Sequence, residues 1–247
     1  MQGIKEAIEF IANLAVKADE PKTLCIKGKT YATKGLQRCD KPDMAEPIHA
    51  TTLTALVDYI KERREELRER MILHVVSPTK VVLYSGLMEE RDRETLFIAE
   101  ALLPKFEYGR EYMQEEFIVS LQTCFDMSDD REAVAMMASN IVSTQKGEYS
   151  DDGISQQAVI KSGVTSKDVA IVPNPVFLVP YRTFSEVEQP ESAFVFRIRE
   201  ATDSSPRFKL VEADGWCWQP EAMQNVKEYL TEQLSDIPDR DKLTIIA

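Results

Sequence analysis

The segment MILHVVSPTKVVLYSG, Met71–Gly86, carries the clearest indication of the fold. Two apolar runs, Met71–Ser77 and Lys80–Gly86, flank a short turn at Pro78-Thr79. Apolar, β-branched runs on either side of a two-residue turn are typical of a β-hairpin. The segment therefore predicts an antiparallel pair of strands.

A third strand is expected after the hairpin. In TLFIAEALL, alternation places Leu96 and Ile98 on one face and Phe97 and Ala99 on the other. The three strands predict an antiparallel meander. Amphipathic helices flank it, because apolar residues recur every three or four positions over residues 2–17, 51–64, 113–125, 129–142 and 220–234.

The order of these elements predicts an α+β fold. Its sheets are antiparallel with flanking helices, and its β-rich C-terminal half is closed by a C-terminal helix. An exposed loop at Lys146–Gly153 suits a boundary between an N-terminal α+β part, residues 1–145, and a C-terminal part, residues 146–247. A single integrated domain is the alternative.

The helix beginning DDREAVAMM gives two local expectations. Asp129, with Glu132 three residues later, is similar to a capping box and would begin the helix. Met136, Met137 and Ile141 are expected to fill the core.

The segment NPVFLVPYRTFSEVEQPESAFVFRIRE, Asn174–Glu200, combines an edge strand with a corner. Its prolines remove backbone donors, which excludes a central strand for the first part. A corner follows at Arg182–Phe184. In the next strand Phe194, Phe196 and Ile198 would face the core. Arg182 is the best candidate for a functional polar residue. The structural alternative is a corner arginine that binds backbone carbonyls or Glu186, and Phe184 is expected to support folding or assembly.

This region also resembles a known family. The matching pieces are Gly163-Val164, Pro173-Asn174-Pro175, Pro180-Tyr181-Arg182-Thr183-Phe184, Glu188-Gln189-Pro190 and Ala213-Asp214-Gly215, with Trp218 before the last helix. Together they are similar to the YfdQ-type family of bacteriophage and prophage proteins, over roughly Ile154–Leu234. The resemblance implies a phage or prophage origin and expression inside a bacterial cell. It brings no catalytic or binding residues with it.

Two further stretches are candidate interaction sites. In the segment Trp216-Cys217-Trp218, an extended backbone would place both rings on one face, either as a structural anchor or against a partner. The apolar tail contains Leu243, Ile245 and Ile246. We expect the tail to pack on the edge of its own sheet or on a neighbouring subunit, with a frayed end as the alternative.

Charge and hydropathy exclude several partners. The net charge is −12, and residues 81–247 carry 16 Lys and Arg against 30 Asp and Glu. Because this surface repels phosphate, tight binding to duplex DNA is not expected. No apolar run reaches 18 residues, so no membrane partner is expected. The charged N-terminus is unlike a secretory signal, which favours the cytoplasm of the bacterial host cell.

Catalytic and metal-binding patterns are missing. The chain has two histidines, His49 and His74, and four cysteines without a Cys-x-x-Cys pair, which are expected to be buried free thiols. No nucleophile elbow or phosphate-binding glycine loop occurs. We therefore expect no enzyme activity, no cofactor and no metal.

The sequence favours a phage-encoded, non-enzymatic accessory protein that acts through protein association. A homo-oligomer is the expected form, and a phage or host protein is another possible partner. Two alternatives remain. One is an anti-defence or recombination accessory protein that binds a small ligand or nucleic acid, for which a deep pocket lined by Arg, Lys and aromatics would be evidence. The other is a metal-dependent hydrolase, for which converging carboxylates would be evidence.

Overall fold

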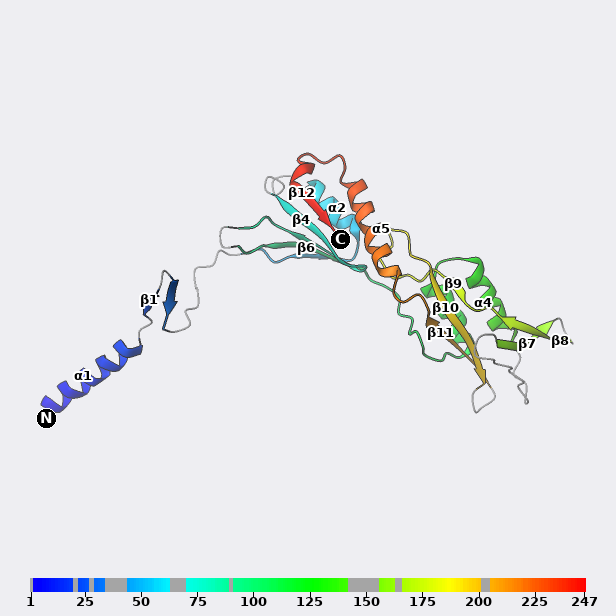
Figure 1. Cartoon of the computed structure of the whole chain (residues 1–247), viewed down its shortest axis with the longest axis horizontal. Coiled ribbons are helices and arrows are strands. Elements are labelled where there is room, and N and C mark those ends of the chain that lie inside the picture. Colours follow the sequence, from blue (N-terminus) through cyan, green and yellow to red (C-terminus); the bar gives the residue numbers. More distant parts are fainter. Residues whose placement is uncertain are drawn as a thin grey trace. The chain divides into compact units, whose positions relative to one another are not determined.

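The computed structural model describes residues 2–19, 22–26, 29–33, 44–62, 70–88, 91–141, 156–162, 166–200 and 205–247. It divides the chain into two compact units, Met1–Met44 and Ala45–Ala247 (Figure 1). The expected fold class is confirmed, because helices accompany sheets whose strands are mostly antiparallel. The expected boundary after residue 145 and the loop Lys146–Gly153 lie outside the described residues.

The first unit holds a helix and a hairpin. Helix α1 spans Gln2–Asp19, which confirms the helix expected over residues 2–17. Strands β1 (Thr23–Ile26) and β2 (Lys29–Ala32) pair antiparallel. Within the described part of the chain, every buried side chain belongs to the second unit. The described residues of the first unit therefore form no core of their own.

The second unit contains a five-stranded sheet in the order β12–β4–β5–β6–β3. The strands are β3 (Ile48–Ala50), β4 (Met71–Ser77), β5 (Lys80–Tyr84), β6 (Thr95–Glu100) and β12 (Leu243–Ile246). Strands β4, β5 and β6 form the expected antiparallel meander, with His74 opposite Val82 and Val82 opposite Ile98. The two edge strands run parallel to their neighbours.

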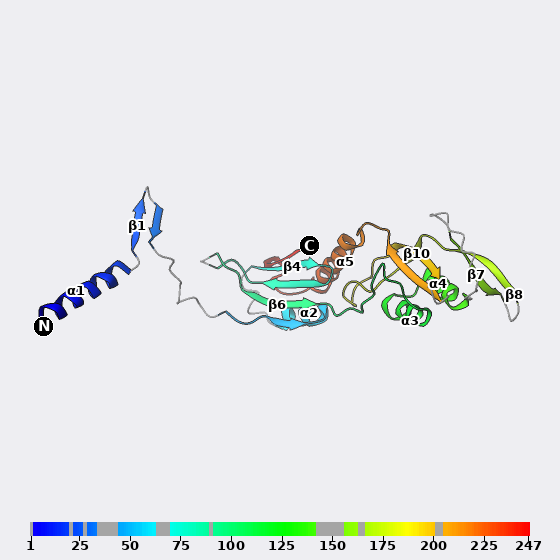
Figure 2. The same ribbon diagram turned by 90° about the horizontal axis from the view of Figure 1, so that it is seen from below.

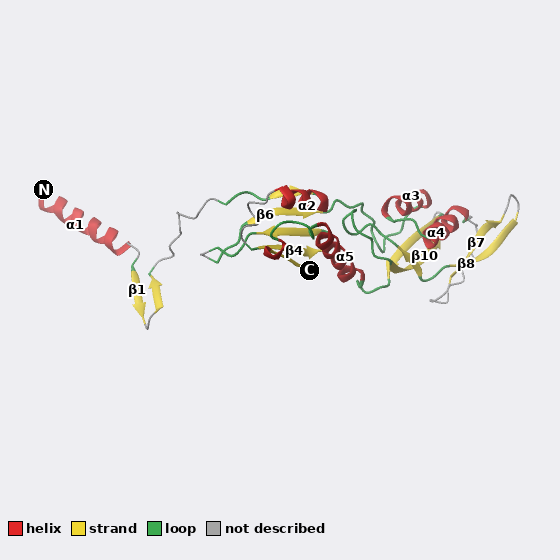
Figure 3. Cartoon of the chain, turned by 90° about the horizontal axis from the view of Figure 1, so that it is seen from above, coloured by secondary structure: helices red, strands yellow, loops and turns green. Residues whose placement is uncertain are grey.

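Helices α2 (Leu53–Glu62) and α5 (Trp218–Gln233) cover one face of this sheet (Figure 3). The stripe that the sequence predicts for α2 is the one that is buried, namely Leu53, Leu56, Val57 and Ile60. Thr52 caps α2, because its Oγ1 accepts a hydrogen bond from the amide of Ala55 at 3.3 Å. Removing this stripe from water stabilises the two-layer core.

A second sheet has the order β11–β10–β9 and is antiparallel. Its strands are β9 (Val176–Leu178), β10 (Ser192–Glu200) and β11 (Pro206–Glu212). As the prolines predict, β9 lies at the edge. Helices α3 (Gln114–Cys124) and α4 (Asp129–Asn140) lie beside this sheet (Figure 2). The ring of Phe117 stacks on Phe196 at 5.6 Å and on Phe208 at 5.2 Å.

The predicted alternation of β10 is confirmed, since Phe194, Phe196 and Ile198 are all fully buried. Strands β7 (Gln156–Ser162) and β8 (Ser166–Val172) form a separate antiparallel hairpin. A 3-10 turn, Arg240–Lys242, precedes β12.

Helix α4 begins at Asp129, as expected, but the residue that caps it differs from the expectation. Ser128, not Asp129, is the N-cap, and its Oγ accepts a hydrogen bond from the amide of Arg131 at 3.1 Å. Asp129 is the first helical residue, where its carboxylate is favourable beside the positive end of the helix dipole.

The buried face of α4 also differs. Val134 and Ala138, four residues apart, are buried, whereas Met136 is 66% exposed. Because successive residues turn by about 100°, Met136 points away from the face that holds Val134. The expectation that Met136 fills the core is therefore wrong, whereas Met137 and Ile141 do pack there.

Both cores draw on distant parts of the chain. The first combines the α2 and meander residues with Phe184 and with Val226, Leu230 and Leu234 from the C-terminal region. The second combines α3 and α4 with β9, β10 and β11. Sequence on either side of residue 145 thus contributes to each core.

Candidate functional site

The corner after the proline-rich edge strand spans Tyr181–Gln189 and is closed by hydrogen bonds. The side-chain oxygen of Gln189 accepts from the amides of Arg182 and Thr183, at 2.9 and 3.1 Å. The hydroxyl of Thr183 donates to the carbonyl of Pro78 at 2.5 Å. The corner is thereby tied to the turn of the meander.

Arg182 is enclosed by aromatic rings. Its side chain is 8% exposed, and its Nη1 pairs with Oε1 of Glu212 at 3.1 Å. The guanidinium carbon lies 4.4 Å from the ring centre of Trp218, 5.5 Å from Phe194 and 5.9 Å from Tyr108. A cation over aromatic faces is attracted by their quadrupoles, most strongly when it is shielded from water. Arg182 therefore joins β10, β11 and the start of α5.

The partner of Arg182 differs from the one expected. Neither Glu186 nor a backbone carbonyl holds the guanidinium, because Glu212 on β11 takes that place. Glu186 instead accepts a hydrogen bond from the amide of Thr54 at 3.1 Å, at the start of α2. Buried as it is, Arg182 contributes to the packing of the second unit.

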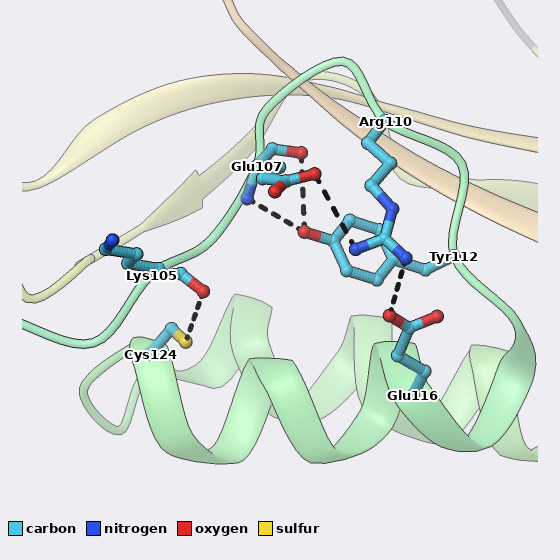
Figure 4. A network of polar contacts seen from close by, with 6 residues as sticks. All are labelled: Lys105, Glu107, Arg110, Tyr112, Glu116 and Cys124. Atoms are coloured by element: carbon cyan, nitrogen blue, oxygen red, sulfur yellow. Dashed lines mark hydrogen bonds and ion pairs between the residues drawn. The ribbon is translucent and has the colours of Figure 1, made fainter.

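A polar network holds the loop that carries Tyr108 (Figure 4). Arg110 pairs with Glu116 of α3 at 2.9 Å and with Glu107 at 3.6 Å. The hydroxyl of Tyr112 accepts a hydrogen bond from the amide of Glu107 at 2.8 Å. These contacts fix the loop on α3, and Tyr108 extends from it toward Arg182.

Burial sets the protonation of this cluster. It raises the pKa of Tyr108 well above the ordinary phenol range, although the nearby Arg182 opposes the change. Burial also lowers the pKa of Arg182, while Tyr108 and Glu212 oppose that change. Tyr108 is therefore a neutral phenol at physiological pH, and the cluster supplies no phenolate nucleophile.

The other candidate residues of the corner and the last helix occupy different environments. Phe184 is 1% exposed and belongs to the first core. Trp218 is half-buried against Arg182, whereas Trp216 is 64% exposed. The extended backbone that a shared face would require is absent, because Gly215 and Trp216 both have positive φ, 62° and 67°. The left-handed turn separates the two rings, so they share no face.

The apolar tail packs on the sheet of its own chain. Strand β12 lies beside β4, with Leu243 opposite Met71 and Ile245 opposite Leu73. Leu243 is 2% exposed and Ile245 packs against the first core, whereas Ile246 is 40% exposed. Of the two arrangements expected for the tail, the structure shows the one in which it extends its own sheet.

Two pockets adjoin the corner. One, of about 450 Å³, is lined by Asp126, Glu188, Glu191 and Glu221 together with Tyr181 and neighbouring residues. The other, of about 230 Å³, is lined by the segment Ala101–Pro104 together with threonines and residues of the corner. Neither lining contains an arginine or a lysine, so neither matches the pocket lined by Arg, Lys and aromatics that would be evidence for a ligand- or nucleic-acid-binding protein.

The two histidines do not form a site together. His74 on β4 and His49 on β3 lie in one row across the sheet, separated by Val82 and Ile98. Three strand spacings place their backbones roughly 14 Å apart. Among the described residues, no group of three His, Cys, Asp or Glu side chains could hold a metal ion.

The prediction that the cysteines are buried free thiols is wrong for two of them. Cys124 is a buried free thiol, as expected, but Cys25 and Cys217 are free and exposed. Cys25 lies in the hairpin of the first unit, where no core covers it, and Cys217 lies in the turn before α5. Cys39 is outside the described residues.

An exposed apolar surface on α1 was missing from the sequence candidates. On α1, six large apolar side chains are more than half exposed: Ile4, Ile8, Phe10, Ile11, Leu14 and Val16. The 3.6-residue periodicity of α1 was visible in the sequence, and it predicts a buried face. The periodicity carries no signal that distinguishes a face covered by its own fold from one covered by another chain.

Comparison with known proteins adds no assignment: no family model, no curated protein and no solved structure matches the chain. Within the described residues, no helix is long and apolar enough to cross a membrane.

Proposed function

We propose that this chain is a phage-encoded accessory protein that acts by associating with other protein chains, without a reaction of its own. The phage context is supported by the similarity of Ile154–Leu234 to the YfdQ-type family. The association is supported by one structural observation, the exposed apolar face of α1.

The argument from α1 is energetic. Ile4, Ile8 and Ile11 are between 61% and 68% exposed on one helix. Each such side chain contributes about 1.5–3 kcal/mol when it is transferred from water into an apolar environment. Soluble proteins rarely leave a contiguous surface of this kind uncovered, and such surfaces mark interaction sites.

The stability of the first unit leads to the same conclusion. Its hairpin, β1 and β2, is two-stranded, and Leu24 and Tyr31 on it are about half exposed. Two-stranded hairpins and single helices of this length are marginal in water on their own. Covering α1 with another protein chain supplies the missing tertiary contacts.

The test is photo-crosslinking in the bacterial cell that expresses the chain. A benzophenone amino acid replaces Ile11 in the middle of the apolar face, and the matched control carries it at Asn13 on the polar face. We expect a covalent adduct with a protein chain from position 11 and much less from position 13. Equal or absent adducts from the two positions would refute the proposal.

A further inference from the structure

The second sheet has one buried face and one that is partly exposed. Because side chains alternate along a strand, burial of Phe194, Phe196 and Ile198 turns the residues between them to the opposite face. Helices α3 and α4 pack on the buried face (Figure 2). The opposite face, which we call the open face, is formed by partly or fully exposed residues of β9, β10 and β11. It has a basic end and an apolar end.

The basic end of the open face holds four cations in two opposed pairs. Arg197 on β10 lies opposite Lys209 on β11, and Arg199 lies opposite Arg207. Opposed backbones are about 5 Å apart, and successive pairs on one face are about 7 Å apart. Although residues 81–247 carry only 16 Lys and Arg in all, four of them therefore gather in one small area.

The stability of the sheet does not explain this arrangement. Like charges directly opposite one another on neighbouring strands destabilise a sheet. Arg199 pairs with Glu111, but the two atoms are 3.7 Å apart and the side chains are 67% and 44% exposed. An ion pair exposed to this degree contributes little. An anionic partner that spans the two pairs of cations would offset their repulsion.

The apolar end of the open face carries an aromatic ring. Val195 lies opposite Val211, and Phe177 on the edge strand β9 lies opposite Ala193. Phe177 is 47% exposed, so part of its ring faces solvent. Proteins that bind single-stranded nucleic acid combine cations that follow the phosphates with aromatic side chains on which the bases stack. The open face provides both kinds of contact.

We infer that the open face binds single-stranded nucleic acid, with phosphates on the basic end and a base on Phe177. This inference goes beyond the proposed function and uses no residue of α1. Three of the four cations are arginines, whose planar guanidinium binds two phosphate oxygens at once. From Ala193 to Arg199 the strand β10 rises about 20 Å, which suits a strand of a few nucleotides.

The surroundings of the open face favour a single strand over the other polyanions. Residues 81–247 carry 30 Asp and Glu, so a stiff duplex that extends beyond the four cations meets repulsion. A flexible single strand can contact the cations and then turn away from the surface. An acidic peptide matches the charge of the basic end, but its carboxylates offer no flat ring to Phe177.

The test measures fluorescence anisotropy of labelled oligothymidine and oligouridine, each of about twelve nucleotides, with the full-length chain. Binding of either strand at about micromolar concentration and low salt is expected, together with weaker binding of a duplex of the same length. Each phosphate contact to a single strand contributes about −0.7 to the slope of log K against log salt concentration. Four contacts therefore predict a slope near −3, on the order of four times that value.

Two sets of variants separate charge from stacking. Arg199→Gln combined with Lys209→Gln should weaken binding roughly tenfold and bring the slope about 1.4 closer to zero. The matched control, Lys105→Gln with Lys227→Gln, removes the same charge from the loop before α3 and from α5, and it should keep the parent slope. Phe177→Ala should weaken binding roughly tenfold at an unchanged slope, because stacking on a ring releases no counterions.

Several results would overturn the inference. One is the absence of binding by both strands at about 100 μM protein, which is the weak limit of non-specific binding. Another is an equal loss from the control pair, which would assign binding to net charge alone. Duplex binding as tight as that of the single strands would exclude the stacking role of Phe177. Displacement of the oligonucleotide by polyglutamate at equal concentration would assign the open face to an acidic protein. Circular dichroism of each variant checks that the second unit remains folded.

Discussion

Replacing Phe184 by alanine tests how the proline-rich corner contributes to the fold. The ring is 1% exposed and packs in the first core beside residues of α2 and α5. Truncating a buried phenylalanine removes its transfer energy and leaves a cavity, at a cost of about 3–5 kcal/mol. For a unit of this size each kcal/mol lowers the melting temperature by about 2–4 °C. Phe184→Ala should therefore melt roughly 10 °C below the parent.

Phe177→Ala provides a matched control. Phe177 lies on the edge strand β9 and is 47% exposed, so the same truncation should cost less than about 1 kcal/mol. Thermal and denaturant unfolding followed by circular dichroism would measure both variants. If the melting temperature of Phe184→Ala equals that of Phe177→Ala and lies close to that of the parent, the corner does not depend on burial of the Phe184 ring. The packing argument then fails.

Three further predictions concern the tail, the cluster around Arg182 and nucleic acid. Deleting Asp241–Ala247 should lower the free energy of unfolding by roughly 2–4 kcal/mol at unchanged mass, because β12 buries Leu243 on its own sheet; dissociation into smaller species would contradict this. Burial raises the pKa of Tyr108 in the folded state above its unfolded value near 10. The contribution of Tyr108 to the free energy of unfolding is therefore complete below pH 10 and is lost as the pH rises further. When the free energy of unfolding is measured against pH, Tyr108→Phe should lose less stability above pH 10 than the parent does. An equal loss in the two proteins would argue against burial of the Tyr108 hydroxyl. The acidic second unit should bind plain duplex DNA no tighter than micromolar at physiological salt, and salt-sensitive sub-micromolar binding by fluorescence anisotropy would overturn that expectation.

Periodicity predicted much of the second unit. The buried stripe of α2 and the inward face of β10 follow directly from spacings of 3.6 and 2 residues. The hairpin of β4 and β5 follows from its two-residue turn. These elements could be predicted from the sequence because each of them is stabilised by burial of one continuous apolar face.

Features that depend on contacts between distant residues could not be predicted from the sequence. Nothing near Arg182 in the sequence indicates Glu212, thirty positions later, as its partner. The separation of Trp216 from Trp218 depends on a left-handed backbone at a non-glycine residue, which propensity does not predict. The local pattern also predicted Met136 in the core, although Met136 is exposed. A local pattern cannot show which side of a helix faces the sheet.

The association surface shows a different limit. The sequence predicted α1 correctly as a helix with one apolar face, and such a face is ordinarily covered by the same domain. Only the structure shows that the described residues of the first unit bury no side chain. What the periodicity could not tell is whether the covering element belongs to the same fold or to another chain.

Hydrogen exchange of the α1 amides, in the full-length chain isolated together with the proteins that bind it in the expressing cell, tests the central claim most directly. If another protein chain covers the helix, the amides of Ile8–Leu14 exchange far more slowly than those of an isolated helix, and Ile11→Glu removes this protection while strand β5 stays protected. Rapid exchange throughout α1 in that preparation, beside a protected β5, would contradict the account.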